Sequence, residues 1–306
     1  MKKITITLIA MIATLCVMAQ TKFWVYNNDG TQTEFLISKV DSISFTEPSA
    51  PTSEKCKASD YPQVTIGTQT WMVENYRCSK YDTESEAYNA SWLTNNTIPT
   101  SDIEEYTPYY TEVYTPYYID ASDKSKWDSY SKQYGVNLTE AQIAKLGYLY
   151  NWAAAVGVEN GAAVGVEDGI ELFSSKRQGI CPNGWHLPSR AEWQMLYDYI
   201  YKDKSLTSKI VGKYLKTTSG WYNGGNGFDI RDGGNGFDSY GFEALPAGDT
   251  VGNGVSHVGY DTSFSTATPG EGGGVYNMYL FYNSANLSEG FDLNQCIGIS
   301  VRCLRN

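Results

Sequence analysis

Histidine is scarce in this chain: His186 and His257 are the only two among its 306 residues. The sequence also contains no C-x-x-C pair, the spacing that most often places two cysteines on one metal ion. No apolar run reaches the ~20 residues that a membrane-spanning helix requires. These absences argue against a metal centre built from cysteine and histidine and against a transmembrane segment.

Basic side chains are also few. The chain has 23 Lys and Arg against 34 Asp and Glu, a formal net charge of −11 and a sequence pI near 4.7. A surface this acidic repels phosphate groups, whether they belong to a nucleic acid or to an anionic lipid. We therefore expect no nucleic-acid partner.

No motif of the sequence places a nucleophile beside a candidate base. His186 follows Trp185 in a stretch typical of packing, so we interpret it as a hydrogen-bonded core group rather than a general base. His257 lies in a glycine-rich loop with no nucleophile pattern near it. We expect no catalytic residues, no enzyme activity and no cofactor, with a Ca²⁺ ion as the one alternative considered below.

The first 19 residues have the layout of a secretory signal peptide. Lys2 and Lys3 precede an apolar run, and Ala19 offers a small residue for cleavage. We therefore expect an exported protein, secreted or on the outer cell surface. Cys16 raises lipid anchoring as an alternative, although Leu15 stands where a lipidation signal has a small residue. Sequence alone does not decide between free secretion and an anchor.

What is abundant is tyrosine and glycine. The 25 Tyr, 8 Trp and 29 Gly, with only 19% charged residues, are typical of an extracytoplasmic, β-rich domain with adhesive loops. Residues 20–45 alternate apolar and polar side chains around Asp29-Gly30, which predicts a β-hairpin module. Residues 46–55 are rich in proline and serine, so we interpret them as a linker.

The most informative stretch runs from residue 179 to 200. Ser189 and Glu192 form the capping-box pattern of a helix start. Within that helix, Trp193, Leu196, Tyr197 and Ile200 follow the i, i+3, i+4, i+7 spacing of one buried face. The structural motif thus comprises a set of five residues: Trp185, His186, Ser189, Glu192 and Trp193.

Two further segments interrupt the regular pattern. Residues 82–135 contain YTPYY twice, and residues 155–170 contain the pair AVGVENG and AVGVEDG, so we expect insertion loops there. Residues 139–156 predict a helix that begins at Thr139 and has a break point at Gly147. Strands, then helices, then strands predict an α+β domain over residues 56–306.

Several pieces occur together in one order: TIGTQTWMVENYRCSKY, GYLYNWAAAV, ICPNGWHLPSRAEW, YGFEALPAG and SVRCLRN. Together they resemble the Fibrobacter succinogenes major paralogous (FISUMP) domain family. The resemblance implies a C-type lectin-like fold with two helices, a mixed, mostly antiparallel sheet and a long loop region. It also implies a surface or secreted location, a role in adhesion or ligand binding, and a disulfide between Cys181 and Cys303. The pairing of Cys56, Cys78 and Cys296 stays open.

The two nine-residue copies at 224–232 and 233–241 each begin G-G-x-G-x-D, as do calcium-binding β-roll repeats. Asp229 and Asp238 are therefore candidate Ca²⁺ ligands. Two copies are too few to build a roll, and Arg231 stands where a large apolar residue is needed. We favour a glycine-rich loop over a calcium site.

Aromatic side chains in the late loops suit stacking on a glycan or polysaccharide. The candidate ligand-binding set is Trp221, Tyr222, Tyr276, Tyr279, Tyr282 and Asn283. The alternative function is a protein–protein assembly or adhesin subunit at the cell surface, because tyrosine-rich loops resemble binder paratopes. Enzymes of the formylglycine-generating type use a closely spaced redox pair of cysteines upstream of the last structural cysteine. No cysteine lies between residues 182 and 295, so this function is disfavoured. The oligomeric state stays open.

Overall fold

The computed structural model describes residues 22–26, 32–36, 53–91, 93–100, 116–159, 176–223, 233–270, 274–292 and 295–306. It divides into two units, residues 1–50 and 51–306. In the first unit, β1 (Lys22–Tyr26) and β2 (Gln32–Leu36) pair antiparallel, as the hairpin pattern predicts. The expected signal peptide lies outside the described residues. The larger unit is α+β with mostly antiparallel pairing, which confirms the α+β part of the predicted fold.

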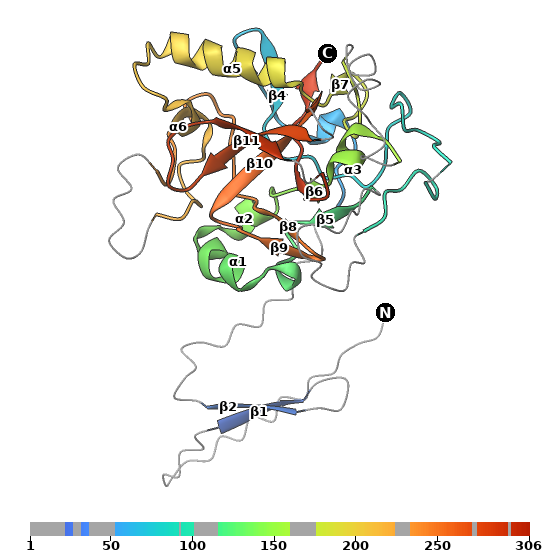
Figure 1. The fold of residues 1–306 in the computed structure, drawn as a ribbon. Helices are drawn as coiled ribbons and strands as arrows, with labels where there is room; N and C mark the ends of the chain where they lie inside the picture. The colour runs from blue at the N-terminus through green and yellow to red at the C-terminus, as the bar shows by residue number, and fades with distance from the viewer. Residues whose placement is uncertain are drawn as a thin grey trace. The chain divides into compact units, whose positions relative to one another are not determined.

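The main sheet of the larger unit has six strands in the order β12-β11-β10-β13-β6-β5 (Figure 1). Its pairs are antiparallel except for β10 with β13, which run parallel. The strands are β5 (Tyr118–Asp120), β6 (Tyr148–Tyr150), β10 (Asp261–Pro269), β11 (Val275–Phe281), β12 (Ser288–Asp292) and β13 (Ile299–Ser300). Thus β13, near the C-terminus, joins the long β10–β11–β12 ribbon to the earlier β5–β6 pair.

A second sheet has four strands in the order β3-β4-β14-β7. They are β3 (Gln63–Ile66), β4 (Gln69–Met72), β7 (Trp185–His186) and β14 (Leu304–Arg305). The first two form a hairpin, and Gly67 adopts the positive φ of 62° that its turn requires. Because β14 pairs with both β4 and β7, the end of the chain holds two distant segments together.

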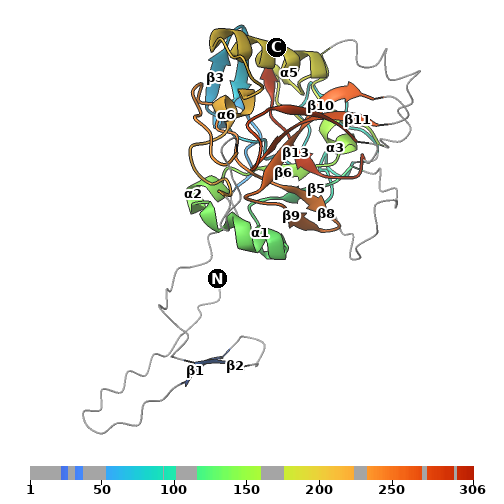
Figure 2. The ribbon, with the colours of Figure 1, turned by 60° about the vertical axis from the view of Figure 1, so that its left-hand side comes forward.

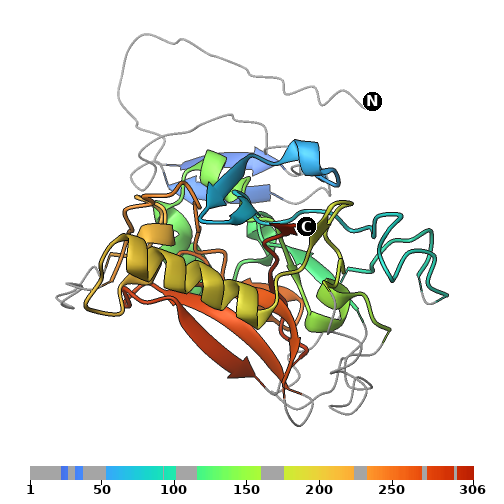
Figure 3. The ribbon, with the colours of Figure 1, turned by 90° about the horizontal axis from the view of Figure 1, so that it is seen from above.

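Helix α5 (Arg190–Asp203) begins with the predicted capping box. Ser189 accepts from the backbone N–H of Glu192, and the Glu192 carboxylate accepts from the backbone N–H of Ser189 at 2.8 Å. Trp193, Leu196 and Ile200 are buried, while Tyr197 is half-buried. Figure 3 shows α5 running alongside β10 and β11, which it contacts, so the predicted apolar face packs on the main sheet.

His186 is a core group, as predicted. It is buried, its Nε2 lies 2.9 Å from Glu192 Oε1, and its Nδ1 lies 2.7 Å from Asn306 Oδ1. Trp185 and Trp193 are also buried. The histidine therefore links the start of α5 to the last residue of the chain.

The described residues contain five α-helices where the resemblance implies two. Besides α5 they are short, namely α1 (Ser129–Tyr134), α2 (Glu140–Ile143), α3 (Trp152–Val156) and α6 (Val211–Leu215). Single 3-10 turns occur at η2 (Ala58–Asp60), η3 (Lys124–Lys126) and η4 (Gly135–Asn137). The extra helices are one or two turns that cap and connect strands.

The helix expected over residues 139–156 is only partly present, and it is interrupted at the predicted break point, Gly147. Thr139 caps α2 as predicted, but the chain then turns at Gly147, with φ of 78°, and enters the strand β6. Pairing of β6 with both β5 and β13 outweighs the local helical pattern. Asn151 then caps α3.

The expected insertion loop at 82–135 is only partly a loop. Within its described residues, β5 adds the edge strand of the main sheet and α1 packs on β9 (Gly254–Ser256). Figure 2 shows α1 beside the hairpin that β9 forms with β8 (Asp249–Val251). The Ser131 side chain fixes this contact by donating to the carbonyl of Val255 and accepting from the backbone N–H of Val258. Of the insertion expected at 155–170, residues 160–170 lie outside the described residues.

Two disulfides lie in the described part of the chain. Cys181 and Cys303 are joined across 122 residues, which confirms the pairing that the resemblance implies. Cys56 and Cys78 form the second bridge, and Cys296 takes part in neither. No helix among the described residues has the length and apolar content to cross a membrane.

Candidate functional site

Strands β10, β11 and β12 place alternate side chains on the face that lies opposite α5. Because successive side chains point to opposite sides of a strand, Asp261, Ser263 and Ser265 share this face. Their direct partners on β11 are Phe281, Tyr279 and Asn277, which therefore share it too. The other face carries Phe264, Met278 and Leu280, which belong to the core beneath α5.

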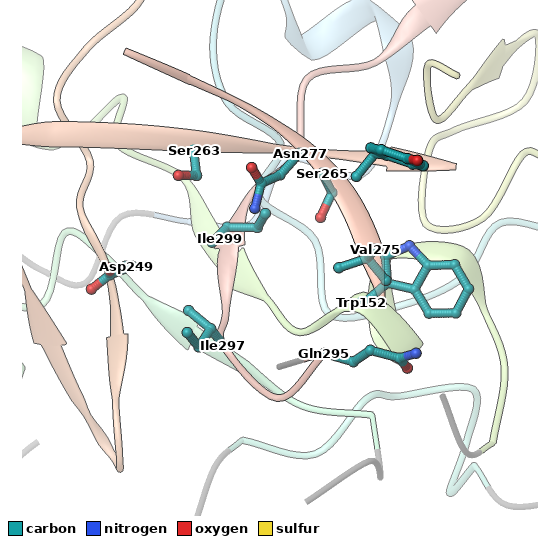
Figure 4. A pocket seen from close by; sticks show the side chains of 10 residues that line it. Trp152, Asp249, Ser263, Ser265, Val275, Asn277, Gln295, Ile297 and Ile299 are labelled. Carbon is teal, nitrogen blue, oxygen red and sulfur yellow. The ribbon is translucent and has the colours of Figure 1, made fainter. Parts of the chain in front are cut away.

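A small pocket opens on this face, between the ribbon and the chain segment before β13. Its volume is about 70 Å³. Figure 4 shows Ser263, Ser265 and Asn277 along one side, with Gln295 and Ile297 on the opposite side. The lining residues are Trp152, Asp249, Ser263, Ser265, Val275, Tyr276, Asn277, Gln295, Ile297 and Ile299. The pocket thus combines apolar walls with several polar groups.

Two oxygens in the pocket are buried without a hydrogen-bond partner among the described residues. They are Ser265 Oγ, on a side chain that is 1% exposed, and Asn277 Oδ1. Gly290, the β12 partner of Asn277, leaves room for this amide, since a Cβ there would lie 2.2 Å from Asn277 Oδ1. Buried polar atoms are nearly always hydrogen-bonded, so the unpartnered Ser265 hydroxyl, which faces the cavity, indicates a place for ligand or water.

The walls of the pocket are held in place by hydrogen bonds and ion pairs. The indole N–H of Trp152 donates to the carbonyl of Thr266 at 3.0 Å. Tyr276 borders the pocket, but its ring lies under the Arg190 guanidinium, 4.3 Å from ring centre to Cζ. Arg190 in turn pairs with Glu289 at 2.6 Å. The aromatic groups that β11 places on this face are therefore Tyr279 and the exposed Phe281, whose rings meet edge to face at 4.8 Å.

A charged cluster adjoins the pocket at Asp249. His257 Nδ1 lies 3.1 Å from Asp249 Oδ1, and this hydrogen bond raises the pKa of His257 to about 9. Burial, together with the nearby charge of Asp249, raises the pKa of Asp261 to about 8. His257 has a positive φ of 61°, which non-glycine residues rarely adopt. The cluster brings together two carboxylates and an imidazole from three chain segments.

A tyrosine cluster lies where β10 begins and β11 ends. Its rings come from α1, from the loop after Trp221 and from the ends of β10 and β11. They are Tyr130, Tyr134, Tyr222, Tyr260 and Tyr282. Ring centroids lie 4.0 Å apart for Tyr260 and Tyr282 and 4.6 Å apart for Tyr134 and Tyr222. Tyr130 is exposed and the other four are half-buried.

The structure separates the predicted ligand-binding residues. Tyr222 and Tyr282 lie in the tyrosine cluster, and the exposed Asn283 follows Tyr282. Tyr279 lies on the pocket side of the sheet, whereas the ring of Tyr276 is partly covered by Arg190. The six residues therefore do not form one surface.

The expectation that Trp221 is available to a ligand is wrong. Its side chain is fully buried, its indole N–H donates to the carbonyl of Ala244, and Lys216 Nζ lies 4.3 Å from the ring centre. Lys216 itself is buried and donates to the carbonyls of Ser284 and Phe281. The Trp221 ring therefore belongs to the hydrophobic core beneath α5.

The structure describes one of the two candidate calcium ligands, Asp238. Asp229 lies outside the described residues. Asp238 is half-buried and accepts from the backbone N–H of Glu243 at 2.9 Å, so it closes a loop. It belongs to neither of the two groups of potential metal ligands among the described residues. Asp238 has a local structural role in this arrangement.

The sequence patterns did not single out Ser265, Asp249 or Asp261, and they assigned no role to His257. The alternating D-T-S-F-S pattern of residues 261–265 is a signal of a strand with one polar face. The partners of that face could not be found, because they depend on the register between β10 and β11.

Comparison with known proteins adds the family. Neither a curated protein nor a solved structure matches the chain. The model of one family, described as the Fibrobacter succinogenes major domain, matches residues 64–305, which include both sheets, α5 and the pocket. Since this match spans well over half of the sequence, the chain belongs to the Fibrobacter succinogenes major domain family.

Proposed function

We propose that the protein is an exported, non-catalytic binding domain that recognises a polysaccharide or glycan at the pocket between β10, β11 and the segment before β13. The observation that carries this proposal is the buried Ser265 Oγ, which faces the pocket without a partner among the described residues and lies beside the Asn277 side chain of the pocket lining. A sugar hydroxyl both donates and accepts hydrogen bonds. It can therefore form hydrogen bonds with the serine hydroxyl and with the Asn277 amide together.

The size of the pocket limits which part of a ligand can enter it. Pockets that enclose a whole small molecule measure roughly 300–1,000 Å³. At about 70 Å³ this one accepts a substituent, such as a hydroxymethyl group, while the rest of the ligand lies outside. Tyr279 and Phe281 stand on the same face and offer apolar surface to the C–H side of a sugar ring. This geometry suits recognition of one sugar unit within a longer polysaccharide.

Export and a C-type lectin-like fold belong to the same proposal. Two disulfides are typical of proteins that fold in an oxidising compartment. One long helix lies over a mixed sheet, and the last strand is tied by Cys303 to the start of the helical region at Cys181. Both features are compatible with that fold and support it without a solved relative.

The test is capture of the chain on a panel of insoluble polysaccharides and on a glycan array, with and without EDTA. Binding of the wild type to at least one glycan, with loss in an Asn277→Leu variant, is the expected result. Capture should persist in EDTA. Loss in EDTA that Ca²⁺ restores would instead support a calcium-dependent lectin, and failure to bind any glycan would contradict the proposal.

A second candidate function is protein–protein assembly through the tyrosine cluster. Five rings from separate segments meet at one place, and tyrosine provides large contact area at low entropic cost in binding loops. Under this candidate, Tyr130→Ala and Tyr222→Ala reduce capture of a protein partner and leave glycan capture unchanged. The two functions are thus distinguishable on one set of variants.

A further inference from the structure

The charged cluster beside the pocket has the composition of a metal site. One ligand atom each from Asp249, His257 and Asp261 lies within 4.8 Å of the others. The other such group in the described part of the chain includes Cys56 and Cys78, whose sulfurs are joined to each other. The Asp–His–Asp group is therefore the one whose ligand atoms are all available.

The backbone fixes the three residues relative to one another. Asp249 begins β8, which pairs with β9, and His257 follows β9 directly. The N–H of Asp261 donates to the carbonyl of His257 at 3.2 Å, and the N–H of Gly248 donates to the carbonyl of Asp261 at 2.8 Å. Ligands held on strands and tight turns are preorganised, which lowers the entropic cost of binding an ion.

The structure assigns a divalent transition-metal site, best matched by Zn²⁺, to Asp249, His257 and Asp261. Zn²⁺ takes imidazole nitrogen and carboxylate oxygen at about 2.0–2.2 Å, so the group must close by roughly 1 Å around an ion. Ca²⁺ needs 6–8 oxygen ligands, and an imidazole favours Zn²⁺ over Mg²⁺ or Ca²⁺. This assignment goes beyond the proposed function, since glycan capture through Ser265 and Asn277 does not require it.

The surroundings give the site an open position. Three protein ligands leave a fourth position on Zn²⁺ for water or a ligand atom. The side chains of His257 and Asp249 are 42% and 26% exposed, so an ion has access from solvent. Asp249 also borders the pocket, into which the buried, unpartnered Ser265 Oγ is directed. A ligand oxygen on the metal would therefore stand at the mouth of the pocket.

Direct metal binding tests the assignment. The chain is prepared without a metal-binding tag and with Cys296→Ser, so that this thiol takes no metal. Zn²⁺ binding is measured by titration calorimetry, and zinc content by atomic emission after dialysis. We expect one ion per chain, and binding weakened at least ~10-fold by His257→Asn or by Asp261→Asn. Asparagine tolerates the left-handed backbone at residue 257. The control Asp198→Asn, an exposed acid on α5, should bind as the parent does. Unchanged stoichiometry and affinity in both ligand variants would overturn the assignment.

A second measurement does not use the ligand variants, so its outcome does not depend on whether those variants fold. Mn²⁺, added to the isotopically labelled chain, should broaden the amide signals of residues 248–250 and 256–262 first. Broadening centred on another part of the chain, or none at all with either metal, would also overturn the assignment. Glycan capture is not a readout in either experiment, so failure here leaves the proposed function standing.

Discussion

Ser265 on β10 and Asn277 on β11 are direct partners across an antiparallel ladder, and both end in a buried oxygen that has no hydrogen-bond partner among the described residues. Direct partners in such a ladder have their Cβ atoms about 4.5–5.5 Å apart, so one ligand group can reach both. Leaving a polar group buried and unpaired costs about 1–3 kcal/mol. The pair is therefore a stability cost that a bound hydroxyl would remove.

Replacing the serine hydroxyl should separate stability from binding. For Ser265→Ala we expect the free energy of unfolding to stay the same or rise by about 1 kcal/mol, because an unpaired buried hydroxyl is removed. Glycan affinity should fall about 3- to 10-fold, the equivalent of one hydrogen bond. Chemical denaturation and affinity measurements on the captured glycan check both values.

The matched control is Thr262→Val. Thr262 Oγ1 is also buried and unpartnered in the described structure, but it lies on the opposite face of β10. Stability should respond as in Ser265→Ala, while glycan affinity should not change. Equal loss of affinity in both variants would show that the effect does not act through the pocket.

The glycine opposite Asn277 provides a second test. A Cβ at residue 290 would lie 2.2 Å from Asn277 Oδ1 and 3.0 Å from the Tyr279 ring, so both side chains must move in Gly290→Ala. We expect the free energy of unfolding to fall by about 1 kcal/mol and the glycan affinity to fall at least ~3-fold. In an Asn277→Ala background the same substitution should have little further effect, as a double-mutant cycle would show. Additive losses would contradict a role for this amide.

The two disulfides should differ in what they contribute to stability. On the chain-entropy model, the bridge from Cys181 to Cys303, with a separation of 122, contributes about 5 kcal/mol, and that from Cys56 to Cys78, with a separation of 22, about 3 kcal/mol. Serine pairs at each bridge, compared by urea denaturation, should reproduce this order. A larger loss at the shorter bridge would indicate that native-state contacts, rather than chain entropy, dominate.

Acid should weaken the start of α5. Burial opposes ionisation of Glu192, but hydrogen bonds from His186 and from Ser189 outweigh it and lower the pKa to about 2. A depressed folded-state pKa gives stability that is present above the unfolded value near 4.5 and is lost as pH falls toward 2. The contribution is about 1–3 kcal/mol.

Unfolding free energies measured from pH 6 to pH 2 test this directly. The difference between the wild type and Glu192→Gln should shrink as pH falls below 4.5, because protonated Glu192 resembles the glutamine. A difference that stays constant over this range would show that the carboxylate charge does not contribute.

Local signals in the sequence predicted part of the fold. The capping box of α5 and the hairpin of β1 and β2 depend on residues a few positions apart, so the pattern is sufficient to place them. The β5–β6 pair was missed because it joins residues 118–120 to 148–150, which no local pattern connects. Strand pairing at a distance overrode the helical periodicity around Leu149.

The candidate site was harder to predict for the same reason. Tyrosine-rich loops pointed to Tyr222 and Tyr282, but their neighbours Tyr134 and Tyr260 come from other segments. Trp221 has the composition of a ligand-binding residue, and its burial depends on Lys216 and on tertiary packing. The pocket arises from ladder register, which composition does not encode.

The most direct measurement of the central claim compares glycan affinity in two double variants. One alters the pocket, Ser265→Ala with Asn277→Leu, and the other alters the tyrosine cluster, Tyr222→Ala with Tyr282→Ala. Affinity for the captured polysaccharide, or for oligosaccharides released from it, is measured by titration calorimetry. The account predicts at least ~10-fold weaker binding in the first variant and wild-type binding in the second. Wild-type binding in the pocket variant, with loss in the tyrosine variant, would contradict it.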